Sequence, residues 1–139
     1  MNMLLYFVAK ALIRLVQALP LAWVARIGRA CGILAFILDR RHRSVAIHNL
    51  TMCFEKEKSP AEIQAIAREN FRRIGENFVS AVKTASMSLD ELRPHLEFCG
   101  FPDEAQAPKA SESFIGAIGH FGNFELYARL GHCFPAHKF

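Results

Sequence analysis

The strongest local constraint on this chain is a helix start at residues 59–62, followed by a long stretch of helical periodicity. Ser59 stands at the N-cap position, Pro60 at the first helical position and Glu62 at the third, which are the residue types of a capping box. Apolar residues then recur at spacings of three and four: Ile63, Ile66, Ala67, Phe71, Ile74, Phe78, Val79 and Val82. This pattern predicts one long amphipathic helix that ends near residue 85 and buries one face.

Helical patterns also cover the chain on both sides of this segment. We predict helices over residues 3–19, where Pro20 interrupts the pattern, and over about 21–38 and 44–53, with a polar junction at 39–43. A second capping box, with Ser88 and Glu91, opens a short helix that Pro94 ends. Residues 40–94 are therefore expected to form a helical region.

Residues 1–39 form an apolar segment in which the only charges before Asp39 are cations: Lys10, Arg14, Arg26 and Arg29. A basic cluster, Arg40-Arg41-His42-Arg43, follows. Such a combination favours anionic lipid head groups or an acidic protein partner, and no recognition motif supports nucleic acid. We predict that residues 1–39 associate with a membrane.

The first helix is expected to be amphipathic and to lie in the membrane interface, because Lys10, Arg14 and Gln17 fall on one stripe opposite the apolar positions. The longest uncharged runs, residues 15–25 and 30–38, are shorter than the roughly 18–20 residues of a membrane span. Two alternatives remain open, a soluble helix that faces a core and an uncleaved signal anchor.

The four cysteines are widely spaced and include no Cys-x-x-Cys pair, which argues against a disulfide framework or a zinc ribbon. We therefore expect no metal site and no cofactor. The length of 139 residues, 52% of them hydrophobic, is that of an ordinary folded domain rather than a disordered chain.

After Pro94 the sequence changes character. Residues 96–100 alternate like a short strand, residues 114–119 resemble a buried strand, and residues 125–131 read as a helix closed by Gly131. We therefore predict an α/β fold, with N-terminal amphipathic helices followed at residues 95–139 by the start of an α/β catalytic domain. Because one or two strands cannot complete such a sheet, we expect the chain to be the N-terminal part of a larger protein.

The second predicted strand leads into the turn that carries the candidate chemistry, in which four residues separate His120 from Glu125. Ligand sites form at the carboxyl ends of strands in α/β sheets, and glycines such as Gly122 allow a backbone to approach a substrate closely. An imidazole can take a proton from an alcohol, and a carboxylate that accepts its other N–H fixes the tautomer. The alternative is that His120 and Glu125 only cap a turn, since the bare spacing is common by chance.

The sequence of this block, Gly119-His120-Phe121-Gly122-Asn123-Phe124-Glu125, resembles the His-x4-Asp/Glu signature of the lysophospholipid and lipid A acyltransferase superfamily. It is most similar to the lipid A biosynthesis (late) acyltransferases, where the block typically reads His-Phe-Gly-Asn-Trp-Glu and Phe124 replaces the tryptophan. Weaker upstream similarities involve Arg43, Val45, Asn49, Leu50, Phe54, Glu69, Asn70, Phe71, Gly75 and Glu76.

This resemblance implies a membrane-bound acyltransferase with an αβα sheet, at the cytoplasmic face of a bacterial inner membrane. His120 would be the general base and Glu125 its orienting partner, with Gly122 and Asn123 as substrate contacts; for Asn123 a helix N-cap is the favoured alternative. The donor would be an acyl carrier protein or acyl-CoA thioester, and the acceptor a hydroxyl of a lipid A precursor.

Three alternatives remain open beside this reading. They are a glycerolipid acyltransferase, a hydrolase that uses the same pair, and a non-catalytic fragment that interacts with a membrane surface. In the family, a later arginine-containing block and further strands complete the site. The 139-residue chain alone is therefore expected to have little transferase activity.

Overall fold

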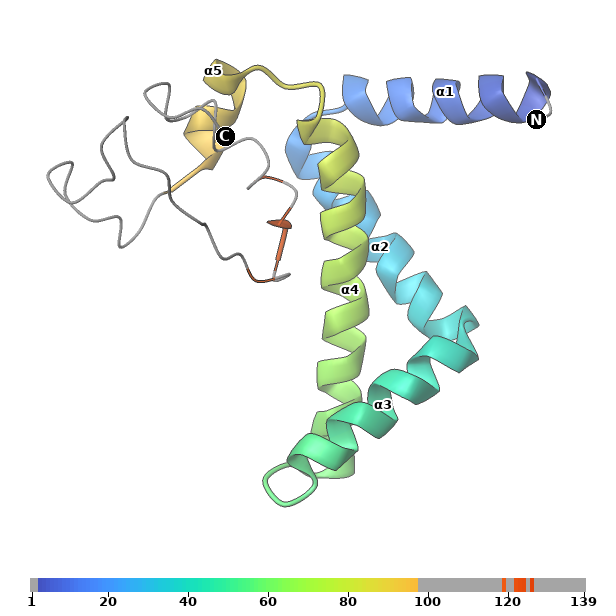
Figure 1. The fold of residues 1–139 in the computed structure, drawn as a ribbon, viewed down its shortest axis with the longest axis vertical. Helices are drawn as coiled ribbons and strands as arrows, with labels where there is room; N and C mark the ends of the chain where they lie inside the picture. Colours follow the sequence, from blue (N-terminus) through green and yellow to red (C-terminus); the bar gives the residue numbers. More distant parts are fainter. Residues whose placement is uncertain (1–2, 98–118, 120–121, 125, 127–139) are drawn as a thin grey trace, which may run out of the picture.

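A computed structural model of the chain describes residues 3–97, 119, 122–124 and 126. Its regular elements are α1 (Met3–Ala18), α2 (Leu21–Leu38), α3 (Arg40–Phe54), α4 (Pro60–Thr84), α5 (Leu89–Leu92) and a 3₁₀ helix η1 (Arg93–His95). Helices α2, α3 and α4 form a triangular body, and α1 projects sideways from one end of it (Figure 1).

The predicted α/β fold class is wrong for the part of the chain that the structure describes, where every regular element is a helix. Of the two predicted strands, Leu96, Glu97 and Gly119 are described and form no strand, and the other residues lie outside the described set. A strand requires a partner for its backbone N–H and C=O groups, and none of the described residues supplies one. The predicted helix over 125–131 also lies almost wholly outside the described residues.

The capping-box predictions are confirmed. The Ser59 side chain accepts a hydrogen bond from the Glu62 N–H, and the Glu62 carboxylate accepts one from the Ser59 N–H at 2.8 Å. Ser88 and Glu91 repeat this arrangement at the start of α5. Pro94, however, ends only the α-helix, because the chain continues through it as the 3₁₀ helix η1.

Helix α3 begins earlier than its sequence pattern predicts, because Asp39 caps it. The Asp39 carboxylate accepts the His42 N–H at 3.0 Å, and its other oxygen lies 2.6 Å from His42 Nδ1. The Arg43 guanidinium donates to the carbonyls of Phe36 and Ile37, at 2.9 and 3.1 Å, which satisfies the end of α2. The predicted polar junction is thus the capped first turn of α3.

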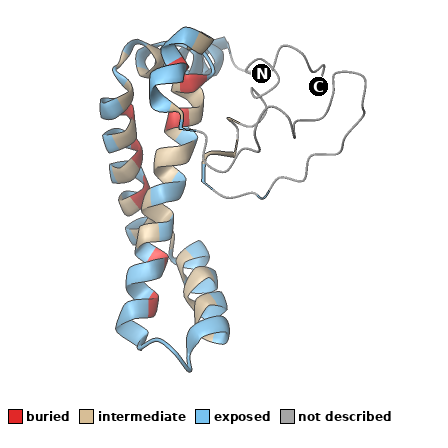
Figure 2. Cartoon of the chain, turned by 90° about the vertical axis from the view of Figure 1, so that its left-hand side faces the viewer, coloured by how far each residue is buried: buried red, intermediate tan, exposed pale blue. Residues whose placement is uncertain are grey.

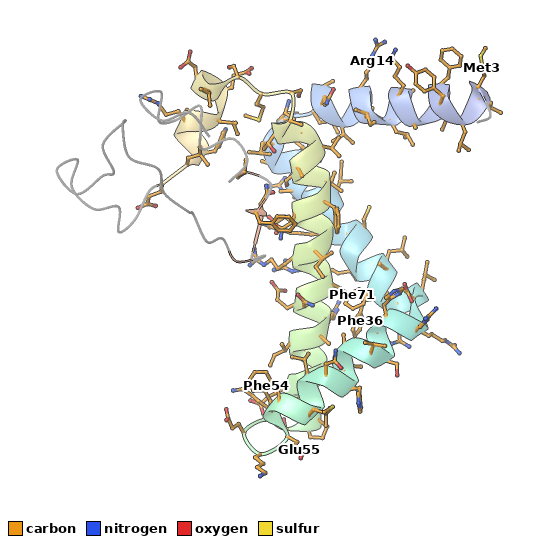
Figure 3. All side chains as sticks on the ribbon, in the orientation of Figure 1. Met3, Arg14, Phe36, Phe54, Glu55 and Phe71 are labelled. Atoms are coloured by element: carbon orange, nitrogen blue, oxygen red, sulfur yellow. The ribbon has the colours of Figure 1, made fainter. Side chains whose placement is uncertain are left out.

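The closest packing in the body is between α2 and α4, where glycines bring two backbones together. A Cβ atom added to Gly28 would lie 2.6 Å from the Gly75 carbonyl oxygen and 2.8 Å from the Glu76 Cα. One added to Gly32 would overlap the Phe71 carbonyl oxygen. Only glycine fits these positions, because the atoms in the way are backbone atoms. Beyond the glycines, the rings of Phe36 and Phe71 meet edge to face (Figure 3).

The core of the described residues is small and follows α2 and α4 (Figure 2). Its fully or nearly buried apolar side chains are Val24, Ile63, Ala67 and Leu92. Ile63 and Ala67 are on the predicted inner face of α4, as their spacing indicates. Phe78 was also predicted on that face but is 72% exposed, so only part of the amphipathic face is covered.

Helix α1 has no buried residue. Its large apolar side chains are 46–76% exposed, from Met3 to Leu15, and Arg14 points away from the body (Figure 3). Two hydrogen bonds join its last turn to α4: Gln17 Nε2 donates to the Val82 carbonyl at 3.3 Å, and Lys83 Nζ donates to the Gln17 carbonyl at 2.5 Å. Among the described residues, helix α1 therefore does not face a core, in contrast to the alternative of a soluble, core-facing helix.

Among the described residues, α2 is long and apolar enough to cross a membrane, by length and composition alone. The sequence did not predict this helix as a possible span, because each of its uncharged runs is shorter than a span. One face of α2 nevertheless packs against α4, a helix that carries Glu69, Arg72, Arg73 and Glu76. Moving α2 into hydrocarbon would carry these charges with it, at a cost of roughly 2.5–3.5 kcal/mol for each one placed at the bilayer centre.

Candidate active site

The described part of the candidate block is a tight turn. Gly122 has φ +63°, in the left-handed region, and a Cβ atom built on it would meet no other atom within 4 Å. Glycine is required here by backbone conformation and not by crowding. The turn is therefore open on the side that the missing side chain would occupy.

Asn123 follows in this turn, and its carbonyl accepts the Leu126 N–H at 3.1 Å, as in one turn of a 3₁₀ helix. The Asn123 Oδ1 atom is buried and has no hydrogen-bond partner among the described residues. The alternative role of Asn123 as a helix N-cap stays a prediction, because Glu125, whose N–H such a cap could bind, lies outside the described residues. A buried acceptor without a donor is costly, by roughly 1–3 kcal/mol, and such an atom is suited to receive an O–H or N–H group.

His120 and Glu125 lie outside the described residues, so the structure does not test whether they pair. The described residues around them, from Gly122 to Leu126, lie beside α4 in both ribbon views (Figures 1 and 2). The described residues of the block are therefore next to the frame that α2 and α4 make.

An ion-pair network holds that frame. Arg29 of α2 binds Glu76 of α4 through two hydrogen bonds, and Arg73 lies 3.3 Å from the same carboxylate. Two turns earlier in α4, the Glu69 carboxylate accepts hydrogen bonds from Arg72 at 2.6 Å and from Arg73 at 2.7 Å. The hydrogen bonds from these two guanidinium groups lower the pKa of Glu69 to about 2.

The pKa of Glu76 is likewise lowered, chiefly by its hydrogen bond from Arg29 and in spite of partial burial. These groups remain charged at neutral pH, so the network does not offer a proton-transfer group. Sequence reasoning noted Arg29 only as an isolated cation and missed its partner, although the Gly-x-x-x-Gly spacing of Gly28 and Gly32 was a usable signal of close helix contact.

An open groove of about 340 Å³ lies between α2 and α4. It is lined by Ile33, Ala65, Arg68, Glu69 and Arg72. None of these is a nucleophile or a group that titrates near neutral pH, so the groove has no evident catalytic chemistry. The described residues contain no group of three or more His, Cys, Asp or Glu side chains that could hold a metal ion.

Comparison with known families identifies the class of protein to which the chain belongs. The family model described as "Bacterial lipid A biosynthesis acyltransferase" matches residues 1–134. This chain belongs to that family. It is therefore an acyltransferase of the lipid A biosynthesis type, and the matched range includes the whole block from Gly119 to Glu125. No curated protein and no solved structure matches the chain.

Proposed function

We propose that this lipid A acyltransferase family member transfers a fatty acyl chain from a thioester to a hydroxyl group of a lipid A precursor. The thioester is carried by acyl carrier protein or CoA. The observation that supports this proposal best is the family match through residue 134, which includes a His-x4-Glu block. The basic chain, with a net charge of +4, suits an acidic carrier protein.

In the proposed mechanism, His120 is the general base and Glu125 is the carboxylate that orients it. One imidazole nitrogen of His120 removes the proton from the acceptor hydroxyl as the oxygen attacks the thioester carbonyl. Glu125 accepts a hydrogen bond from the other ring N–H and stabilises the imidazolium. The carbonyl then re-forms, the carbon–sulfur bond breaks, and the imidazolium returns the proton to the departing thiolate.

Gly122 and Asn123 are proposed as substrate contacts in the same site. The open side of the Gly122 turn allows a substrate to approach the backbone, and the unpaired Asn123 Oδ1 is an acceptor for a substrate O–H or N–H. Such a contact would remove the cost of leaving this atom without a donor.

We also propose that residues 1–39 attach the enzyme to the cytoplasmic face of the bacterial inner membrane, with α1 as the main lipid contact. The exposure of α1 along its length supports this assignment. Its cations, Lys10 and Arg14, would lie among lipid head groups. In this arrangement α2 stays outside the hydrocarbon because its charged partner α4 accompanies it.

The test is an acyl-transfer assay on membranes in which the protein and its variants are made from the complete reading frame that encodes this chain, because the 139 residues alone are expected to have little activity. His120→Ala is expected to lower the rate by roughly 10²–10⁴-fold, the range for loss of a general base, and Glu125→Ala should also lower it. His95→Ala is the matched control, because His95 is an exposed histidine in η1. All variants should remain in the membrane fraction. Unchanged transfer by His120→Ala would contradict the proposed mechanism.

The same assay, run with different acceptors or with none, separates the remaining alternative functions. A lipid A precursor is expected to be acylated, whereas glycerol phosphate and lysophosphatidate should not be. Omitting the acceptor should stop thioester consumption. Preferential acylation of a glycerol-based acceptor would favour a glycerolipid acyltransferase, and continued release of free fatty acid without acceptor would favour a hydrolase.

A further inference from the structure

The end of α2 and the start of α3 form a protruding corner with exposed apolar and cationic side chains. We define the α2–α3 corner as Leu34, Ile37, Leu38, Arg40 and Arg41. The three apolar side chains are 55%, 57% and 70% exposed. Both arginines are exposed, and no hydrogen bond or ion pair among the described residues involves their guanidinium groups.

The structure divides the basic cluster of the sequence into two parts. Arg43 turns inward, where it donates to the carbonyls of Phe36 and Ile37 and stacks over the Phe36 ring at 5.5 Å. His42 is held by Asp39, 2.6 Å from its carboxylate. Only Arg40 and Arg41 remain to bind an external anion, and they directly follow the exposed apolar end of α2.

The direction of α1 indicates which side of the body faces a bilayer. Both α1 and the α2–α3 corner project to the same side of α4 (Figure 1). Lys10 lies at the middle of this helix by sequence, and the residues before it in α1 are uncharged. The side of the body to which α1 and the corner project is therefore the side that would face the lipid, with Lys10 and Arg14 among the head groups.

We infer that the α2–α3 corner is a second membrane contact, in which Leu34, Ile37 and Leu38 meet the lipid interface and Arg40 and Arg41 bind anionic head groups. The occupant is a lipid surface because the corner combines exposed apolar groups with unpaired cations at the outermost point of the body on the side to which α1 points. The inference rests on the proposed membrane contact of α1 and is independent of the acyl-transfer chemistry.

The single tryptophan of the chain, Trp23, makes a fluorescence test direct. In a Trp23→Phe background, Leu38→Trp places the only tryptophan at the corner, and Phe78→Trp places it on α4, at a position that is 72% exposed. Both substitutions are at exposed positions, and circular dichroism of each variant checks that the fold is retained. Each 139-residue variant is bound to vesicles of phosphatidylethanolamine and phosphatidylglycerol, and flotation verifies binding.

The tryptophan at position 38 is expected to shift its emission to shorter wavelength on the vesicles and to be quenched by lipids brominated on their acyl chains. The tryptophan at position 78 should keep the emission of an indole in water. If the chain floats with vesicles but the position-38 emission is unchanged, the corner is not a lipid contact and the inference fails. Failure of every variant to float would overturn the membrane role of α1 as well.

A second experiment tests the two arginines of the corner independently. The double variant Arg40→Gln/Arg41→Gln should weaken partition into the anionic vesicles by roughly fivefold per arginine and leave partition into phosphatidylcholine vesicles unchanged. Lys56→Gln/Lys58→Gln removes the same charge from the loop at the far end of α3 and is the matched control. Equal losses in the two double variants would show that net charge alone acts, and would overturn the assignment of head-group binding to the corner.

Discussion

Arg29 and Glu76 join the middle of α2 to the middle of α4 by two parallel hydrogen bonds, Nε to Oε2 at 2.8 Å and Nη2 to Oε1 at 2.5 Å. The pair lies next to the Gly28–Gly75 contact, where the two backbones pack closely. The Glu76 side chain is 16% exposed and the Arg29 side chain 38%. Position and geometry together fix the relative register of the two helices.

Loss of one member of this pair should destabilise the body. Arg29→Met leaves the partly buried Glu76 carboxylate with only its weaker contact to Arg73, and we expect a lower free energy of unfolding. Urea denaturation measures it, with Arg68→Met as a control because Arg68 makes no ion pair among the described residues. A loss equal to that of the control would contradict this role for Arg29.

The glycine contact predicts a steric effect. Gly32→Ala would place a methyl group over the Phe71 carbonyl oxygen and 2.9 Å from the Arg72 Cα, and backbone atoms cannot rotate away. We expect a destabilisation of about 1–3 kcal/mol, although alanine is the better helix former. Gly119→Ala is the control, since a Cβ there meets nothing within 4 Å. Stabilisation by Gly32→Ala would show that the helices are not in close contact.

The Glu69 network predicts a pH dependence. Its folded-state pKa of about 2 is below the ordinary value of 4.5, so the charged carboxylate stabilises the fold above pH 4.5. This contribution is lost as the pH falls from 4.5 to about 2. Denaturant midpoints measured across that range should fall more steeply for the wild type than for Glu69→Gln. Glu57→Gln, in the exposed loop after α3, should keep the wild-type slope; identical slopes for all three proteins would refute the role of Glu69.

The backbone of Gly122 predicts an effect on activity. Its φ of +63° costs an ordinary side chain roughly 1–2 kcal/mol, and less for asparagine. Gly122→Ala should therefore slow acyl transfer by roughly tenfold or more, Gly122→Asn should slow it less, and Gly119→Ala should be close to wild type. Equal activity of the alanine and asparagine variants would show that the left-handed turn is not needed for catalysis.

The helical part of the fold was largely predictable because its signals are local. Ser59 and Glu62 define the start of α4 by contacts within one turn, and Pro20 separates two apolar patterns. The start of α3 was missed because the Asp39 cap also binds the His42 side chain, a contact that no periodicity reveals. The Arg29–Glu76 pair joins residues 47 positions apart, and such pairings depend on tertiary packing.

For the candidate active site, the sequence predicted the class of chemistry but not the arrangement of the residues. The residue types of the block and the family match agree on the acyltransferase class, but the pairing of His120 and Glu125 remains a prediction. The predicted strands were inferred from alternation and apolar runs alone. Strands depend on partners distant in sequence, which a local pattern cannot supply.

The junction between α1 and α2 has a mechanical consequence. Only Leu19 and Pro20 separate the two helices, and the Gln17 and Lys83 hydrogen bonds brace α1 against the end of α4. A tilt of α1 relative to the body would therefore break these two hydrogen bonds or move the end of α4 with it. Because glycine contacts hold α4 against α2, such a movement of α4 would carry α2 with it.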